Sequence, residues 1–185
     1  MTKKKQEVDF RTRKLVFMDF EMTGLDPVVH EITEVGVLVV NPKTLNVEKE
    51  YYAKVRPEHI ETAVKKALKI GGYSDAKWTD SRKASLVFRE LNRLAPGGIP
   101  SGWNVHKDYA FLYNTLKRYR IKDRFDHHLL DVAVLGYQKY FNHTKPVEMG
   151  LRDVARILKV NIPEKHDAMS DIYATYKIYL KLLEQ

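Results

Sequence analysis

Cysteine is absent from the 185-residue sequence, which excludes disulfide bonds, zinc–thiolate sites and thiol nucleophiles. Oxygen atoms and imidazoles are therefore the ligands that remain for a metal ion. Long apolar runs are also lacking: residues 37–40 make a strand-sized run, and no segment approaches the ~18 residues of a membrane span. The charged residues 1–6 have no apolar stretch behind them, so no secretory signal is indicated. These absences predict a cytoplasmic protein that does not engage a membrane.

The charge of the chain is unbalanced toward the basic side. Lysine and arginine total 32 against 24 acidic residues, which gives a net charge of +8. Such a surface attracts phosphate backbones, but a merely soluble basic protein is an equally good explanation until a phosphate-handling site is found. Residues 1–13 are polar and basic and are expected to form a flexible arm. Residues 14–185 are expected to form a single domain, because the length suits one core.

The pattern of apolar residues predicts alternating strands and helices. Period-two patterns and β-branched residues predict strands at 14–20, 31–41, 47–55, 99–103 and 128–132. Helical spacing predicts helices at 58–70, 81–94, 107–119, 133–141, 148–158 and 168–183. This order predicts one α/β domain with a central mixed five-stranded sheet flanked by helices.

The first segment with chemical potential follows the first predicted strand. Asp19 and Glu21 are two residues apart, so their side chains point to the same face of a strand. Two carboxylates side by side repel each other and favour a bound cation, and oxygen ligands suit Mg²⁺ or Mn²⁺. For this pair alone, an exposed acidic strand end is the simpler explanation. The glycine-containing turn at residues 23–25 would let backbone approach a ligand closely.

Two further segments carry acidic residues at helix starts. The fourth predicted strand ends near Asn104, and Asp108 falls in the first turn of the next helix, where an aspartate often only complements the helix dipole. His166 precedes the last helix, and Asp171 lies in its first turns. That spacing is weak by itself, but small residues such as Ala168 indicate a helix face that packs closely on the sheet.

Taken together and in order, these segments resemble the DEDD exonuclease superfamily, in the branch with a histidine in the third motif (DEDDh). Residues 19–25 match the first motif, Asp-x-Glu-x-Thr-Gly-Leu. Asn104 and Asp108 match the second motif, and His166 and Asp171 match the third, His-x-x-x-x-Asp. Each motif is weak to moderate in specificity, whereas the three in order are specific. The resemblance covers about residues 15–183 and implies a ribonuclease H-like fold and 3′→5′ exonuclease activity.

The resemblance also implies roles for individual residues. Two divalent ions, Mg²⁺ or Mn²⁺, would be bound by Asp19, Glu21, Asp108 and Asp171, and His166 would be the general base that deprotonates the attacking water. Two ions and an imidazole of near-neutral pKa suit hydrolysis of a phosphodiester. The last nucleotide would contact residues that could otherwise simply pack the turn or end the strand, namely Met22, Thr23, Gly24, Leu25 and Asn104.

The substrate stays open between subgroups of this family. Residues 21–27 resemble oligoribonuclease, which degrades short RNAs, whereas residues 150–158 and 166–168 resemble the proofreading epsilon subunit of DNA polymerase III. The lead-in at residues 102–104 counts against oligoribonuclease, so the proofreading-like group is favoured. The expected partners are single-stranded DNA or RNA with a free 3′ end and, in addition, a polymerase or other repair or replication protein. A catalytically inactive nucleic-acid-binding module is the alternative from another class, but no motif residue is missing.

Other conspicuous residues have simpler explanations. Asp131 is expected to cap a helix, and Glu34 to be a buried hydrogen-bonding residue rather than a metal ligand. Trp103 would suit base stacking, but core packing explains it at least as well. His127 and His128 show no acidic partner at a spacing typical of a ligand set, and they are interpreted as ordinary.

Overall fold

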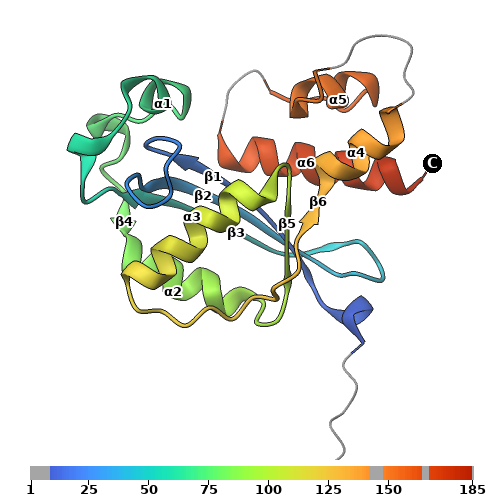
Figure 1. Ribbon diagram of the computed structural model, residues 1–185, viewed down its shortest axis with the longest axis horizontal. Helices are drawn as coiled ribbons and strands as arrows, with labels where there is room; N and C mark the ends of the chain where they lie inside the picture. The colour runs from blue at the N-terminus through green and yellow to red at the C-terminus, as the bar shows by residue number, and fades with distance from the viewer. Residues whose placement is uncertain (1–8, 142–147, 164–166, 185) are drawn as a thin grey trace, which may run out of the picture.

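The computed structural model describes residues 9–141, 148–163 and 167–184, which form a central sheet with helices on both faces (Figure 1). The sheet has six strands in the order β4-β3-β2-β1-β5-β6. The strands are β1 (Leu15–Met22), β2 (Ile32–Val40), β3 (Val47–Arg56), β4 (Arg82–Lys83), β5 (Ile99–Gly102) and β6 (Leu130–Asp131). The α-helices are α1 (Lys65–Ile70), α2 (Ala84–Leu94), α3 (Val105–Arg118), α4 (Val132–Tyr140), α5 (Leu151–Ile157) and α6 (Ala168–Leu183). Short 3₁₀ turns are η1 (Phe10–Thr12), η2 (Ile60–Thr62) and η3 (Asp75–Lys77).

The sheet is mixed, as predicted, but has one more strand than predicted. Strands β1, β2 and β3 are antiparallel, whereas β5 joins β1, β6 joins β5 and β4 joins β3 in parallel. The five-stranded prediction is wrong because β4 consists of two exposed basic residues, Arg82 and Lys83. A strand of that length and polarity has no alternation to detect.

The alternation along β1 divides the core into two clusters. Met18 packs in the cluster formed with α2 and α3, and Phe17 packs in the cluster formed with α4, α5 and α6. Figure 1 shows α2 and α3 on one side of the sheet and α4–α6 on the other. Because strand side chains alternate, Asp19 and Glu21 continue the face of Phe17, which is the face that α6 covers.

The start of α6 lies directly on the sheet beside Asp19. Gly36 on β2 is the register partner of Asp19, and a Cβ atom added to Gly36 would be 2.7 Å from the backbone carbonyl of Ala168. Only a residue without a side chain permits this approach. The close packing brings the first turns of α6, and with them Asp171, to the carboxylate end of β1.

Strand β5 pairs with β1 over only a short distance. Their ladder joins Leu15–Phe17 to Ile99–Ser101, and beyond it β1 pairs on one side only, with β2. At the point of divergence, a Cβ on Gly102 would be 2.8 Å from the carbonyl oxygen of Met18. Helix α3 then begins beside the unpaired edge of β1.

The predicted helices differ from the observed ones mainly at their starts. The predicted helix at 58–70 is divided into η2 and α1, because the Val64 N–H donates to the carbonyl oxygen of Thr23 at 2.7 Å instead of continuing a helix. Helix α2 starts after β4, and α6 has the predicted bounds. Residues 1–8 of the predicted arm lie outside the described part of the chain. Among the helices that the structure describes, none is long and apolar enough to cross a membrane.

Candidate active site

Three carboxylates from two elements converge at the end of β1. Asp19 and Glu21 come from β1, and Asp171 comes from the first turns of α6. Oxygen atoms of the three side chains lie within 4.8 Å of one another. Period-two alternation positions the first two, and the packing of α6 on Gly36 brings the third. The structure thus assembles three of the four predicted metal ligands into one group.

The fourth predicted ligand, Asp108, lies beside the group and is held by backbone. Its Oδ1 accepts a hydrogen bond from the Phe20 N–H at 3.0 Å, on the edge of β1 that β5 has left. The side chain is buried, with the residue 6% exposed. A carboxylate on the first turn of α3 therefore replaces the missing strand partner of Phe20, and it approaches Asp19 closely enough that their charges interact.

Crowding and burial make these carboxyl groups reluctant to ionise. Burial, reinforced by the charges of Asp108 and Asp171, raises the pKa of Asp19 well above its ordinary value. Burial and the charge of Glu34 raise the pKa of Glu21 to about 7. Burial raises the pKa of Asp108 to about 8. A set of buried carboxylate oxygens with mutual repulsion fits a hard divalent cation, which neutralises the charges and accepts oxygen ligands.

The raised pKa values predict how the stability of the metal-free protein changes with pH. A carboxyl group whose pKa is higher in the folded than in the unfolded state stabilises the fold at low pH and loses that contribution as pH rises through the folded value. For Glu21 the shift from 4.5 to about 7 corresponds to roughly 3 kcal/mol. We expect the Tm in EDTA to fall by about 5–10 °C between pH 5 and pH 8 from this group, as measured by differential scanning calorimetry.

The matched variant Glu21→Gln isolates that effect, because it removes the titrating group and keeps its shape. Its Tm should fall less over the same pH range, and millimolar Mg²⁺ should raise the wild-type Tm more at pH 8 than at pH 5. Parallel pH profiles for the two proteins in EDTA would show that Glu21 does not titrate as described.

Cationic and capping groups fix the start of α6. Arg152 on α5 lies with Nη2 3.7 Å from Oδ1 of Asp171, and its Nη1 donates to the carbonyl oxygen of Pro163 at 2.9 Å. Asp167 caps α6 by accepting the Ser170 N–H at 2.9 Å. The sequence interpretation assigned no role to Arg152, because a basic residue at the start of a short helix carries no distinctive spacing. The predicted base His166 lies outside the described residues.

The turn after β1 contains predicted site residues that are buried and one that is exposed. Thr23 is fully buried, and its hydroxyl oxygen accepts the Glu31 N–H at 2.9 Å. A Cβ on Gly24 would be 2.4 Å from the ring of His30, so a larger residue here would have to displace that ring. Leu25, by contrast, is 89% exposed. Of the predicted nucleotide contacts in this turn, Leu25 is the one that presents its side chain to solvent.

Asn104 precedes α3 in a left-handed conformation, with φ 54° and ψ 39°. Its N–H donates to Oδ1 of Asp131 at 3.0 Å, and the same oxygen caps α4 by accepting the Ala133 N–H at 3.0 Å. The predicted capping role of Asp131 is therefore confirmed. Trp103 is 8% exposed and belongs to the core, and Glu34 is buried as predicted.

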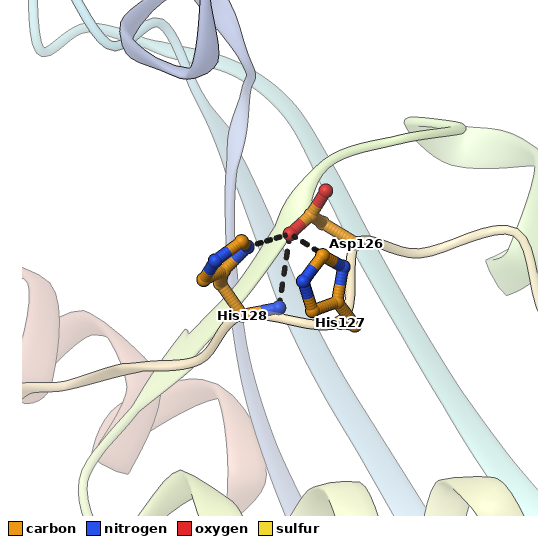
Figure 2. Close-up of side chains that lie close together, drawn as sticks. All are labelled: Asp126, His127 and His128. Carbon is orange, nitrogen blue, oxygen red and sulfur yellow. Dashed lines mark hydrogen bonds and ion pairs between the residues drawn. The ribbon is translucent and has the colours of Figure 1, made fainter.

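A second group of side chains of metal-binding types, Asp126, His127 and His128, is drawn in Figure 2. The ion pair of Asp126 with Arg13 places this group near the start of β1. Oδ1 of Asp126 accepts the His128 N–H at 2.9 Å and lies 2.6 Å from His128 Nδ1, and His127 Nδ1 is 3.7 Å away. No acidic partner was expected at a spacing typical of a ligand set, whereas in the structure both imidazoles lie near Asp126, which precedes them by one and two residues in a tight turn. Arg13 forms an ion pair with the same carboxylate, which neutralises it and ties the residues before β1 to those before β6.

Comparison with known proteins agrees with this geometry. The sequence model of the family described as "Exonuclease" (RNase_T) matches residues 16–179. The chain is 25% identical over 175 residues to a PolC-type DNA polymerase III of Thermotoga petrophila, covering 95% of this chain and 12% of that protein. It is 25% identical over 141 residues to an oligoribonuclease of Vibrio parahaemolyticus, covering 69% of this chain and 76% of that protein.

Solved structures of exonuclease I share the fold. One superposes with a TM-score of 0.79 at 17% identity, over 93% of this chain and 41% of that one. An E. coli exonuclease I in complex with a dA16 oligonucleotide superposes with a TM-score of 0.74 at 19% identity, over 93% and 41% of the two chains. These matches confirm the ribonuclease H-like fold. The chain spans about an eighth of the PolC-type relatives and less than half of the exonuclease I chains.

Proposed function

Because the chain belongs to the exonuclease family, we propose that it hydrolyses single-stranded DNA or RNA from a free 3′ end and releases nucleoside monophosphates. The observation that carries this proposal is the convergence of Asp19, Glu21 and Asp171 within 4.8 Å, with Asp108 anchored beside them. Four carboxylates so close together are costly without counter-ions. Two Mg²⁺ or Mn²⁺ ions held by these residues would supply an activated water and stabilise the leaving 3′ oxygen.

The residues of the chain have distinct tasks in this proposal. The three clustered carboxylates and Asp108 bind and space the ions, and the hydrogen bond from Phe20 fixes the orientation of Asp108. His166 accepts the proton of the attacking water, as the resemblance of the third motif implies, and an imidazole is suited to that task near neutral pH. Leu25, exposed beyond the end of β1, contacts the base of the last nucleotide. Met22 and Asn104 border the same nucleotide.

The substrate subgroup is proposed from the extent of the similarities. The PolC-type relative aligns with 95% of this chain and the oligoribonuclease with 69%, which favours a general single-strand exonuclease over one dedicated to very short RNAs. A polymerase or a repair or replication protein is the corresponding protein partner. An inactive binding module is disfavoured, because all four acidic residues are present and three are already grouped.

The test uses one oligonucleotide sequence as DNA and as RNA, labelled at either end. With Mg²⁺ or Mn²⁺, a 3′ label should appear immediately in mononucleotide, whereas a 5′ label should appear in a ladder of successively shorter products. EDTA should abolish both. Cleavage of a circular single strand, or activity that persists in EDTA, would contradict a metal-dependent exonuclease.

The role of His166 is tested in the same assay with His166→Ala. We expect kcat to fall by about 10²–10⁴-fold, as for loss of a general base, while the increase in Tm caused by the metal ion is retained. A loss of that increase would mean that His166 serves metal binding rather than proton transfer.

A further inference from the structure

A cavity of about 300 Å³ opens beside the carboxylate cluster, over β2 and β3. It is separate from the turn that carries Leu25. A volume of this size is at the lower end of those that hold small ligands. The lining residues that matter here are Glu34, Tyr52, Lys54, Gly71, Lys77 and Asp167.

The register of the sheet places this cavity directly next to the proposed metal ligands. Glu34 on β2 pairs with Glu21, and Lys54 on β3 pairs with Glu34. Asp19 on β1 likewise pairs with Gly36 on β2, and Gly36 pairs with Tyr52 on β3. Neighbouring strands are about 4.8 Å apart, so Tyr52 and Lys54 lie roughly 10 Å from the carboxylates on the same face of the sheet.

The cavity and the cluster share a wall. A Cβ on Gly71 would be 3.0 Å from Oε2 of Glu21, so the backbone at Gly71 borders both. On the other side, Asp167 lines the cavity at the start of α6, and its charge acts on Glu21. A nucleic-acid strand that passes from the carboxylates across β2 therefore enters this cavity directly.

The proposed contacts of the last nucleotide lie on the other side of the carboxylates. Leu25 extends from the turn beyond β1, Met22 packs against the core cluster of α2 and α3, and Asn104 precedes α3. The cavity lies over β2 and β3 instead. A strand whose last nucleotide contacts Leu25 and whose scissile phosphate lies at the carboxylates would thus place its next nucleotide in the cavity.

The lining offers what a nucleotide requires. The ring of Tyr52 is accessible, with the residue 47% exposed, and its hydroxyl is engaged by Glu34, which holds the ring in place for stacking. Lys77 is exposed. Lys54 places its ammonium group at the same wall, where it donates to the carbonyl oxygen of Lys77 at 2.8 Å and is ion-paired with Asp80 at 3.0 Å. Because Asp80 already neutralises Lys54, Lys77 is the basic lining residue that suits a phosphate.

We propose that this cavity binds the nucleotide on the 5′ side of the scissile phosphate, with its base stacked on Tyr52 and its own 5′ phosphate near Lys77. The site holds a base without reading its identity, because every base has a face for stacking. This inference rests on the proposed exonuclease function and adds a second nucleotide-binding position to it.

The test removes the aromatic ring and the base that it would contact, separately and together. For a 10-mer, Tyr52→Ala should raise the substrate concentration at half-maximal rate for release of the first nucleotide about five- to tenfold. An abasic residue at the penultimate position should have a similar effect on the wild-type protein. The two changes combined should be less than twofold worse than either one, because they remove the same contact. Fluorescence anisotropy of the same 5′-labelled oligonucleotides gives a second measurement that does not depend on hydrolysis.

Matched controls distinguish stacking from other effects. Tyr52→Phe keeps the ring and loses only the hydroxyl that Glu34 engages, so its effect should be smaller than that of Tyr52→Ala. Tyr137→Ala removes an exposed tyrosine of α4 and should have no effect. An abasic residue five positions from the 3′ end should also be neutral. Equal losses for Tyr52→Ala on the normal and abasic substrates, or no loss on either, would overturn the proposal. Wild-type activity that survives Asp19→Asn would instead contradict the proposed function itself.

Discussion

Replacement of Asp19 by asparagine should lower kcat/KM for nucleotide release by on the order of 10³-fold, equivalent to about 4 kcal/mol of transition-state stabilisation. Burial, and after it the charges of Asp108, Asp171 and Glu21, raise the pKa of Asp19. An amide of the same shape keeps one oxygen but loses the charge that a divalent ion needs. The rate is measured by single-turnover release of the first nucleotide.

The same substitution should not destabilise the metal-free protein. Removing one of several repelling charges relieves the cluster, so the Tm in EDTA should stay equal or rise, while the increase caused by Mg²⁺ should shrink. The control is Glu48→Gln, which removes a carboxylate paired with Lys14 near the start of β3 and should leave the rate unchanged. A rate within tenfold of wild type for Asp19→Asn would refute its role as a ligand.

Replacement of Gly36 by alanine should be the most damaging small change in the sheet. The new Cβ would lie 2.7 Å from backbone atoms of Ala168 and 3.0 Å from the nitrogen of Met169, and backbone cannot rotate away as a side chain can. We expect a loss of about 2–3 kcal/mol in the free energy of unfolding, measured by urea denaturation. Because α6 carries Asp171, a displacement of about 1 Å should also lower activity by up to ~10²-fold.

Gly136→Ala is the matched control for that experiment. Gly136 lies within α4, and its added Cβ would meet side chains only at 3.5 Å or more. Since alanine favours a helix over glycine by up to ~1 kcal/mol, this variant should be as stable as wild type or more so, with full activity. If both variants lose the same stability, contact with α6 is not the reason for the effect at Gly36.

Local sequence patterns predicted those parts of the site that depend on one element. Asp19 and Glu21 share a face because any strand alternates, and Asp131 caps α4 because aspartate favours that position. The bounds of α6 follow from its apolar spacing. The shortened α1 could not be predicted, because the Val64 N–H donates to the carbonyl oxygen of Thr23, a residue 41 positions earlier.

Contacts between elements decided the rest. The hydrogen bond from Phe20 to Asp108 exists because β5 leaves β1 after three paired residues, and no local pattern records where two strands part. The proximity of Tyr52 to Asp19 likewise depends on the register through β2. Arg152 reaches Asp171 from a different helix. The sequence identified the acidic residues of the site by their order along the chain. The contacts that each of them makes depend on the fold.

The hydrogen bond from the Phe20 amide to the Asp108 carboxylate has a spectroscopic consequence. A backbone amide whose acceptor is a carboxylate experiences the full charge of that group, so its proton resonance shifts when the carboxylate is protonated or binds a cation. The Phe20 amide is therefore a built-in reporter at the edge of β1, next to the cluster and outside it. In an isotope-labelled sample, its resonance would follow the ionisation of Asp108 and the arrival of a metal ion without any added probe.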